Sequence, residues 1–184
     1  LNAEREAEDA AEGRVHLPMR IGIGVNSGVC VVGNMGSDIR FDYSVLGDSV
    51  NVASRLEGQT KEYGVPILVG DATARHVLGR MALIEVDLIR VKGKSVPERI
   101  YALLGAEEIA QSPDLRIASE EIGRLLAAYR AADWTGARAA VAAATAARAV
   151  GLGGLIETYG ARLDAFEEEP PGPDWDGVYV AKSK

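Results

Sequence analysis

The sequence predicts a mixed fold, α/β or α+β, followed by a helical extension. Up to about residue 105, short β-rich runs alternate with segments of helical periodicity. Beyond that point the composition changes to Ala, Arg and Glu, which favours helices. The chain has 184 residues, of which 47% are hydrophobic, so it can form one domain with an appendage or two small domains.

The first part of the chain is expected to contain strands separated by helices. Residues 1–12 are typical of the solvated end of a helix, which Gly13 would terminate. Residues 20–25 and 29–32 predict strands on either side of a tight turn, because residues 26–28 (Asn-Ser-Gly) have turn composition. The remaining elements expected before residue 105 are strands at 41–46, 66–69, 82–91 and 100–104 and helices at 48–63 and 71–78.

The second part predicts a helical hairpin. Helical periodicity covers 117–132 and 135–150, with a third candidate helix at 155–166. The spacing of Tyr129 and Trp134 resembles half of a tetratricopeptide repeat, so we expect a separate, TPR-like helical unit.

Composition also suggests where the chain divides. The domain boundaries predicted are 1–105 for the mixed domain, 106–169 for the helical extension and 170–184 for a Pro-rich tail without regular structure.

Charge and cysteine content exclude some classes of protein. The net charge of -7 argues against a nucleic-acid binder, which needs a basic face. Cys30 is the only cysteine, so no intrachain disulfide forms, and we expect Cys30 in the core of a protein of the reducing cytoplasm. Neither a membrane span nor a signal peptide is evident, and the first residue is Leu1, so the sequence is expected to begin within a longer protein.

Two polar side chains on the expected helix 48–63 are candidates for catalysis. Asn51 and Arg55 are four residues apart, so both project from one face. An amide and a guanidinium together can orient and neutralise a phosphate whose charge grows in a transition state. The alternative from spacing alone is an ordinary solvated helix face. A nearby dinucleotide motif is excluded, because its third glycine, Gly28, falls one position late and precedes another strand.

Residues 43–56 (YSVLGDSVNVASRL) resemble the signature of class III adenylate and guanylate cyclases. The preceding 20–28 (RIGIGVNSG) and 32–36 (VGNMG) and the later 91–94 (VKGK) are similar to the family's strands and late hairpin, in the same order. The resemblance implies a ferredoxin-like nucleotide cyclase domain of the α+β class, truncated at its N-terminus.

The same resemblance implies roles for five residues. Asn51 would help orient the ribose, and Arg55 would contact a phosphate of the nucleotide. Ser44 stands at the purine-selecting position, and the main chain near Val45 would also touch the base. Lys92 would reach the terminal phosphates. The alternatives are a plain strand serine for Ser44 and an ordinary charged turn residue for Lys92.

The resemblance further implies ATP as substrate and Mg²⁺ or Mn²⁺ as cofactor. The family's metal-binding aspartates precede the matched stretch, so their ligands are expected upstream of this chain, and the isolated chain is expected to be inactive. Two catalytic domains pair in this family, which implies a homodimer. The function implied is an adenylate cyclase, converting ATP to cyclic AMP and pyrophosphate in signal transduction.

Residues 170–180 resemble the tail of bacterial membrane-anchored sensor cyclases. This implies a cytoplasmic segment without membrane contact of its own, in a longer protein held at the inner membrane. Two other functions stay open: a non-catalytic cyclase-like regulatory or dimerisation module, and a protein-interaction module formed by the helical hairpin.

Overall fold

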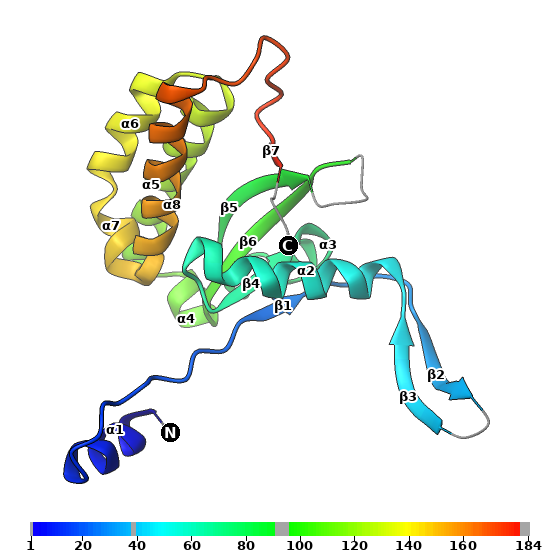
Figure 1. The fold of residues 1–184 in the computed structure, drawn as a ribbon. Coiled ribbons are helices and arrows are strands. Elements are labelled where there is room, and N and C mark those ends of the chain that lie inside the picture. The colour runs from blue at the N-terminus through cyan, green and yellow to red at the C-terminus, as the bar shows by residue number, and fades with distance from the viewer. Residues whose placement is uncertain (1, 38–39, 91–95, 181–184) are drawn as a thin grey trace.

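The computed structural model describes residues 2–37, 40–90 and 96–180. Its strands are β1 (Ile23–Val25), β2 (Val31–Ser37), β3 (Arg40–Leu46), β4 (Ile67–Gly70), β5 (Ala82–Arg90), β6 (Glu98–Gly105) and β7 (Tyr179–Val180). Its helices are α1 (Asn2–Ala11), α2 (Asp48–Tyr63), α3 (Asp71–Val77), α4 (Glu107–Ala110), α5 (Pro113–Arg130), α6 (Trp134–Ala143), α7 (Thr145–Ala147) and α8 (Gly153–Glu168), with a π-helical turn η1 (Arg148–Leu152). These strands and helices form a mixed α+β fold, as expected (Figure 1).

The strands of the described residues form two sheets. The larger one has five strands in the order β1-β4-β6-β5-β7, and the smaller one pairs β2 with β3. The two strands expected at 20–25 and 29–32 are both present, but they do not form a hairpin across the expected turn. β1 pairs in parallel with β4, with Ile23 opposite Ile67, while β2 pairs antiparallel with β3 from Val31 opposite Leu46.

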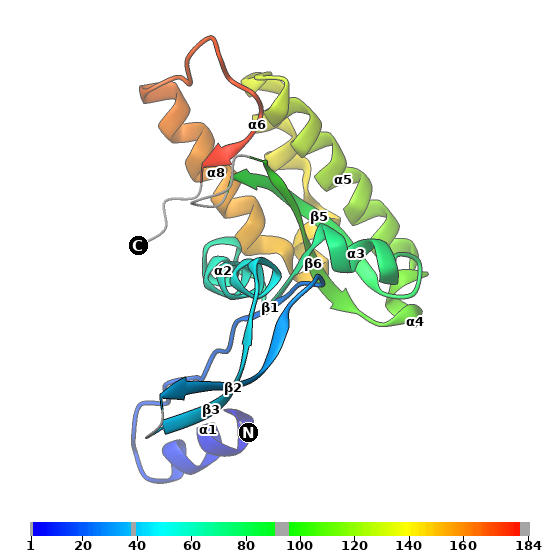
Figure 2. The same cartoon turned by 90° about the vertical axis from the view of Figure 1, so that its right-hand side faces the viewer.

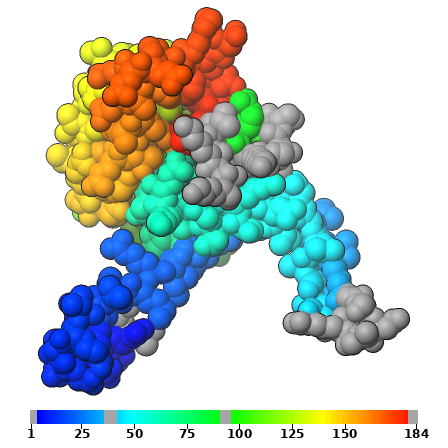
Figure 3. Space-filling view, viewed as in Figure 1, coloured from blue at the N-terminus to red at the C-terminus, as the bar shows by residue number. Residues whose placement is uncertain are grey.

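The β2–β3 ribbon projects away from the rest of the molecule, as does the segment that ends in α1 (Figures 1 and 3). Several of its apolar side chains are open to solvent, including Tyr43 at 77% and Val31 at 66% exposure. Cys30, at the base of the ribbon, is exposed rather than in the core as expected. The reason is that the chain leaves the larger sheet here and buries neither face of the ribbon.

The C-terminal helices do not pack as the separate unit that composition suggested. α5 and α8 lie against β5 (Figure 2), and the Tyr159 hydroxyl of α8 donates a hydrogen bond to the Val86 carbonyl oxygen at 2.9 Å. Buried residues of the sheet, α2 and these helices form one hydrophobic cluster. The apolar face of α5, which includes Ile122 and Leu125, is therefore buried in this common cluster.

The tail is also more ordered than its prolines suggested. Tyr179 pairs in parallel register with Ile89, so β7 extends the larger sheet. Before it, Trp175 packs edge-on against Tyr129 with ring centroids 5.6 Å apart, and Asp176 forms an ion pair with Arg90 at 2.7 Å. The ring contacts stabilise the position of this segment, although its prolines prevent a regular helix or strand.

Within the described ranges, no single helix is long and apolar enough to cross a bilayer. The helical segments Trp134–Ala143 and Thr145–Glu168 reach the length and composition of a membrane span only when they are taken together, and they are bent by 52° relative to each other.

Candidate functional site

The helix α2 carries both Asn51 and Arg55 and packs directly against β1 and β4. Its buried side chains are Val52, Leu56, Thr60 and Tyr63. The close approach to β1 depends on Gly24, because a Cβ at this position would overlap the Ala53 carbonyl oxygen and the Glu57 backbone nitrogen. Gly24 is thus a packing residue that sets the position of α2.

The loop after β1 holds the first turn of α2. The side-chain amide of Asn26 donates a hydrogen bond to the Ser49 carbonyl oxygen at 3.2 Å, and the Ser49 hydroxyl donates to the Val29 carbonyl oxygen at 3.1 Å. The helix begins after Gly47 without a capping side chain. Sequence reasoning missed Asn26, whose only signal was its place in a turn.

Asn51 and Arg55 project from the part of α2 that the core does not cover. Asn51 is exposed and Arg55 is half-buried, while their neighbours Val52 and Leu56 point into the core. In the part of the chain that the structure describes, no hydrogen bond or ion pair engages the Asn51 amide or the Arg55 guanidinium. Both groups therefore retain their hydrogen-bonding capacity for a ligand, and a guanidinium can bind two phosphate oxygens at once.

The other predicted nucleotide-binding residues lie elsewhere. Ser44 and Val45 are on β3, where they face Gly33 and Val32 of β2. Ser44 is half-buried and Val45 is 41% exposed, and among the described residues no hydrogen bond joins either to the pair on α2. Lys92 lies outside the described residues.

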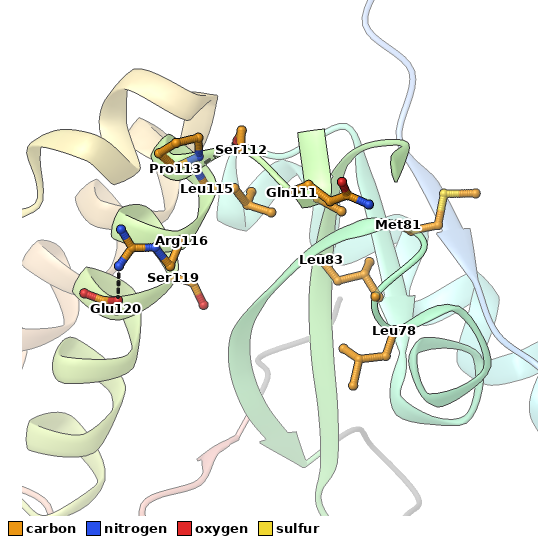
Figure 4. A pocket seen from close by; sticks show the side chains of 12 residues that line it. Leu78, Met81, Leu83, Gln111, Ser112, Pro113, Leu115, Arg116, Ser119 and Glu120 are labelled. Atoms are coloured by element: carbon orange, nitrogen blue, oxygen red, sulfur yellow. Dashed lines mark hydrogen bonds and ion pairs between the residues drawn. The ribbon is translucent and has the colours of Figure 1, made fainter. Parts of the chain in front are cut away.

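Two cavities of the described residues lie away from the predicted pair. One, of about 620 Å³, lies between residues 20–22, which precede β1, and the second half of α2, and it is lined by Arg20, Glu57 and Lys61 among others. Another, of about 470 Å³, lies between the turn after α3 and the start of α5, beside Leu78 and Arg116 (Figure 4).

The described residues do not fit a divalent cation. No three His, Cys, Asp or Glu side chains among residues 2–37, 40–90 and 96–180 come together as a ligand set. Mg²⁺ and Mn²⁺ favour several carboxylate oxygens, so metal binding by this stretch alone is not supported.

The far end of α2 is joined to β5 and α8 by a buried polar cluster. Asp87, which is 1% exposed, accepts hydrogen bonds from the Tyr63 hydroxyl at 2.7 Å and from Arg162 at 2.6 Å. Arg162 also donates to the Glu62 carboxylate at 2.8 Å and lies over the Tyr179 ring, 3.4 Å from its centroid. Burial raises the pKa of the Tyr63 phenol well above its usual value, and the negative charge of Asp87 raises this pKa further. Tyr63 therefore stays protonated as a donor.

Residues 3–105 match the model of the adenylate and guanylate cyclase catalytic domain, which covers more than half of the chain. The chain belongs to this family, as the motifs around Asn51 and Arg55 indicated. α2, β1 and the β2–β3 ribbon all fall within the matched part, whereas α5 to α8 and β7 follow it.

Among curated relatives, the chain is 36% identical over 101 residues to adenylate cyclase 1 of Rhizobium meliloti, which is 54% of this chain and 15% of that protein. It is 40% identical over 106 residues to the adenylate cyclase of Anabaena cylindrica, which is 55% of this chain and 20% of that protein. The chain thus spans a fifth or less of these relatives' length. A crystal structure of the adenylyl cyclase CyaB from P. aeruginosa is 32% identical, with a TM-score of 0.46 over 55% of this chain and 52% of that one.

Proposed function

We propose that this chain forms part of the catalytic site of an adenylate cyclase, which converts ATP to cyclic AMP and pyrophosphate in signal transduction. The observation that carries the proposal is that Asn51 and Arg55 project from the side of α2 that the core does not cover, in a chain of the cyclase family. Relatives named adenylate cyclase support ATP as the substrate.

In this reaction the ribose 3′-oxygen bonds to the α-phosphorus, and the bond from that phosphorus to the pyrophosphate oxygen breaks. The 3′-hydroxyl proton is released. Negative charge grows on the phosphate oxygens in the transition state, and the forked donors of Arg55 are suited to bind them. Asn51, one helical turn earlier, can hydrogen-bond the ribose and hold the 3′-oxygen in line. Ser44 and Val45 are proposed to contact the purine and Lys92 the terminal phosphates.

The family generally uses a divalent cation, ATP and a pair of domains. We propose that Mg²⁺ or Mn²⁺ is held by carboxylates upstream of this chain and that the partner is a second copy of the domain. The exposed apolar side chains of the β2–β3 ribbon are available for such an association. Isolated residues 1–184 are accordingly proposed to be inactive.

The test is cyclic AMP formation by the full-length protein that contains this chain, with Mn²⁺ and ATP. Asn51→Ala and Arg55→Ala should each lower kcat by about a hundredfold while KM for ATP changes little, because transition-state contacts are lost. Gln59→Ala, also on α2, is the matched control and should keep the kcat of the unmodified protein. Unchanged kcat in both variants of the pair would refute the assignment, and a full-length protein that forms no cyclic nucleotide would favour a regulatory module instead.

We also propose a cytoplasmic location in a longer protein held at the inner membrane. This rests on the resemblance of residues 170–180 to the tails of membrane-anchored sensor cyclases. Fractionation of cells should place the full-length protein in the membrane pellet, and recovery in the soluble fraction would contradict the anchor.

A further inference from the structure

The C-terminal end of α2 is hydrogen-bonded to α8, and α8 lies outside the part of the chain that matches the cyclase family. The Thr158 hydroxyl of α8 lies 2.6 Å from the Glu62 carbonyl oxygen, one of the last carbonyl groups of α2, and 2.9 Å from the Gly154 carbonyl oxygen of its own helix, so its proton is shared between the two helices. One turn further along α8, Arg162 donates to the Glu62 carboxylate at 2.8 Å and to the Tyr63 hydroxyl at 3.0 Å. Both contacts act on the same turn of α2.

The two backbones also touch at this point. Gly64 ends α2 with a left-handed φ of 63°, and it faces Gly154 at the start of α8. A Cβ added to Gly154 would lie 2.8 Å from the Gly64 Cα, closer than real Cβ atoms approach. Because the obstructing atom belongs to the backbone, the helices would have to separate to admit a side chain.

Asp87 fixes this contact to the sheet. A bulge in β5 places Asp87 opposite Ile100, on the face that the helices cover, although Glu85 only two residues earlier stands opposite Tyr101. Asp87 is then neutralised by Arg162 at 2.6 Å. Moving α8 along the sheet would separate a buried ion pair, so α8 has a defined position against β5.

We propose that α8 is a positioning element for the catalytic helix: the contacts of Thr158, Arg162 and Gly154 with the end of α2 set the placement of Asn51 and Arg55. The proposal rests on the proposed function. Arg55 precedes Glu62 by seven residues, which is about 10 Å along a helix axis. A shift of α2 at its far end is transmitted over this distance, because the helix moves as a rigid unit.

Thr158 provides the sharpest test, since Val replaces its hydroxyl by a methyl group that cannot donate a hydrogen bond. In the full-length protein, Thr158→Val should lower kcat for cyclic AMP formation by about tenfold or more, with KM for ATP within about twofold, because misplaced catalytic groups affect the transition state most. Thr158→Ser keeps the donor and should retain kcat. Gly154→Ala should behave like Thr158→Val. Asp164→Asn, which alters an exposed ion pair of α8 with Arg138, is the matched control and should leave kcat unchanged.

Hydrogen exchange gives a readout that does not depend on activity. In Thr158→Val, the amides of α2 should exchange about fivefold faster than in the Asp164→Asn control, as expected for the loss of one hydrogen bond at the helix end. Unaltered exchange in α2, unaltered kcat in both Thr158→Val and Gly154→Ala, or an equal loss of kcat in Thr158→Ser would overturn the proposal. If the unmodified protein forms no cyclic AMP, the proposed function fails, and exchange in α2 still decides whether α8 positions this helix.

Discussion

Gly24→Ala tests whether the packing of α2 on β1 controls the proposed catalytic pair. The new Cβ would lie 3.0 Å from the Ala53 carbonyl carbon and closer still to the Ala53 oxygen and the Glu57 nitrogen, whereas ordinary contacts are 3.4–4 Å. Ala53 lies between Asn51 and Arg55, and Glu57 follows Arg55 by two residues. Because the obstructing atoms belong to the backbone, the whole of α2 must move away from β1 by on the order of 1 Å. Gly24 itself does not need a left-handed backbone, so the effect is steric.

A displacement of that size can reduce catalysis by about a hundredfold, and the overpacking should cost about 1–3 kcal/mol of unfolding free energy. The assay is kcat for cyclic AMP formation by the full-length protein, alongside urea denaturation. Gly58→Ala is the matched control, because it lies on α2 with no atom near its added Cβ and should be neutral or slightly stabilising. Normal kcat and normal stability in Gly24→Ala would show that the contact with β1 does not set the position of α2.

Further predictions concern the core, the tail and the ribbon. Leu56→Ala removes a side chain with 0% exposure and should lower the free energy of unfolding by about 3 kcal/mol or more in urea; a loss below about 1 kcal/mol would contradict its place in the core. The Asp176 carboxyl has a pKa held below its usual value by the hydrogen bond from Arg90, so its stabilising contribution is present above about pH 4 and is lost as the pH falls through the lowered folded-state pKa. Trp175 fluorescence should therefore change in that acid range, and Asp176→Asn should abolish the change. An identical titration of the fluorescence in both proteins would show that Asp176 is not the group responsible. The isolated chain should associate with rising concentration through its exposed apolar ribbon, and Tyr43→Ser should reduce its light scattering, whereas equal scattering from both would place the association elsewhere.

Local patterns predicted single elements well. The helix expected at 48–63 is found as Asp48–Tyr63, because apolar residues recur at helical spacing and Gly64 adopts the left-handed conformation that ends it. Asn51 and Arg55 lie on that helix, as their spacing required. Their catalytic roles stay a prediction, and so do those of Ser44, Val45 and Lys92.

Long-range pairing was not predictable from local sequence. The partner of β1 is β4, and nothing in residues 20–28 distinguishes this from a hairpin with the next strand. The helix expected at 135–150 stops at Ala143, and a π-helical turn follows in which Gly151 has a φ of 93°. The buried carboxylate of Glu121, which accepts a hydrogen bond from the Ala147 nitrogen, supports this irregular segment, and it comes from a different helix.

The packing of the C-terminal helices on the sheet could not be predicted from the sequence. Asp87 gave no signal of burial, since an Asp in an alternating strand is expected to face solvent. The β5 bulge turned it inward, and the matching cation, Arg162, lies 75 positions later in the chain. Such a pair is recognisable only once both elements are packed together.

The buried Asp87 also constrains how this protein can evolve. A lineage that lost the residues after the family match would lose the cation that pairs with Asp87 and also the helices that bury it, which would expose the apolar face of the sheet. Replacing Asp87 alone would leave Arg162 with Glu62 as its remaining ion-pair partner. Removal of the extension is therefore opposed mainly by the apolar surface that it covers, and it becomes accessible only through compensating changes on that surface or through a prior gain of stability elsewhere.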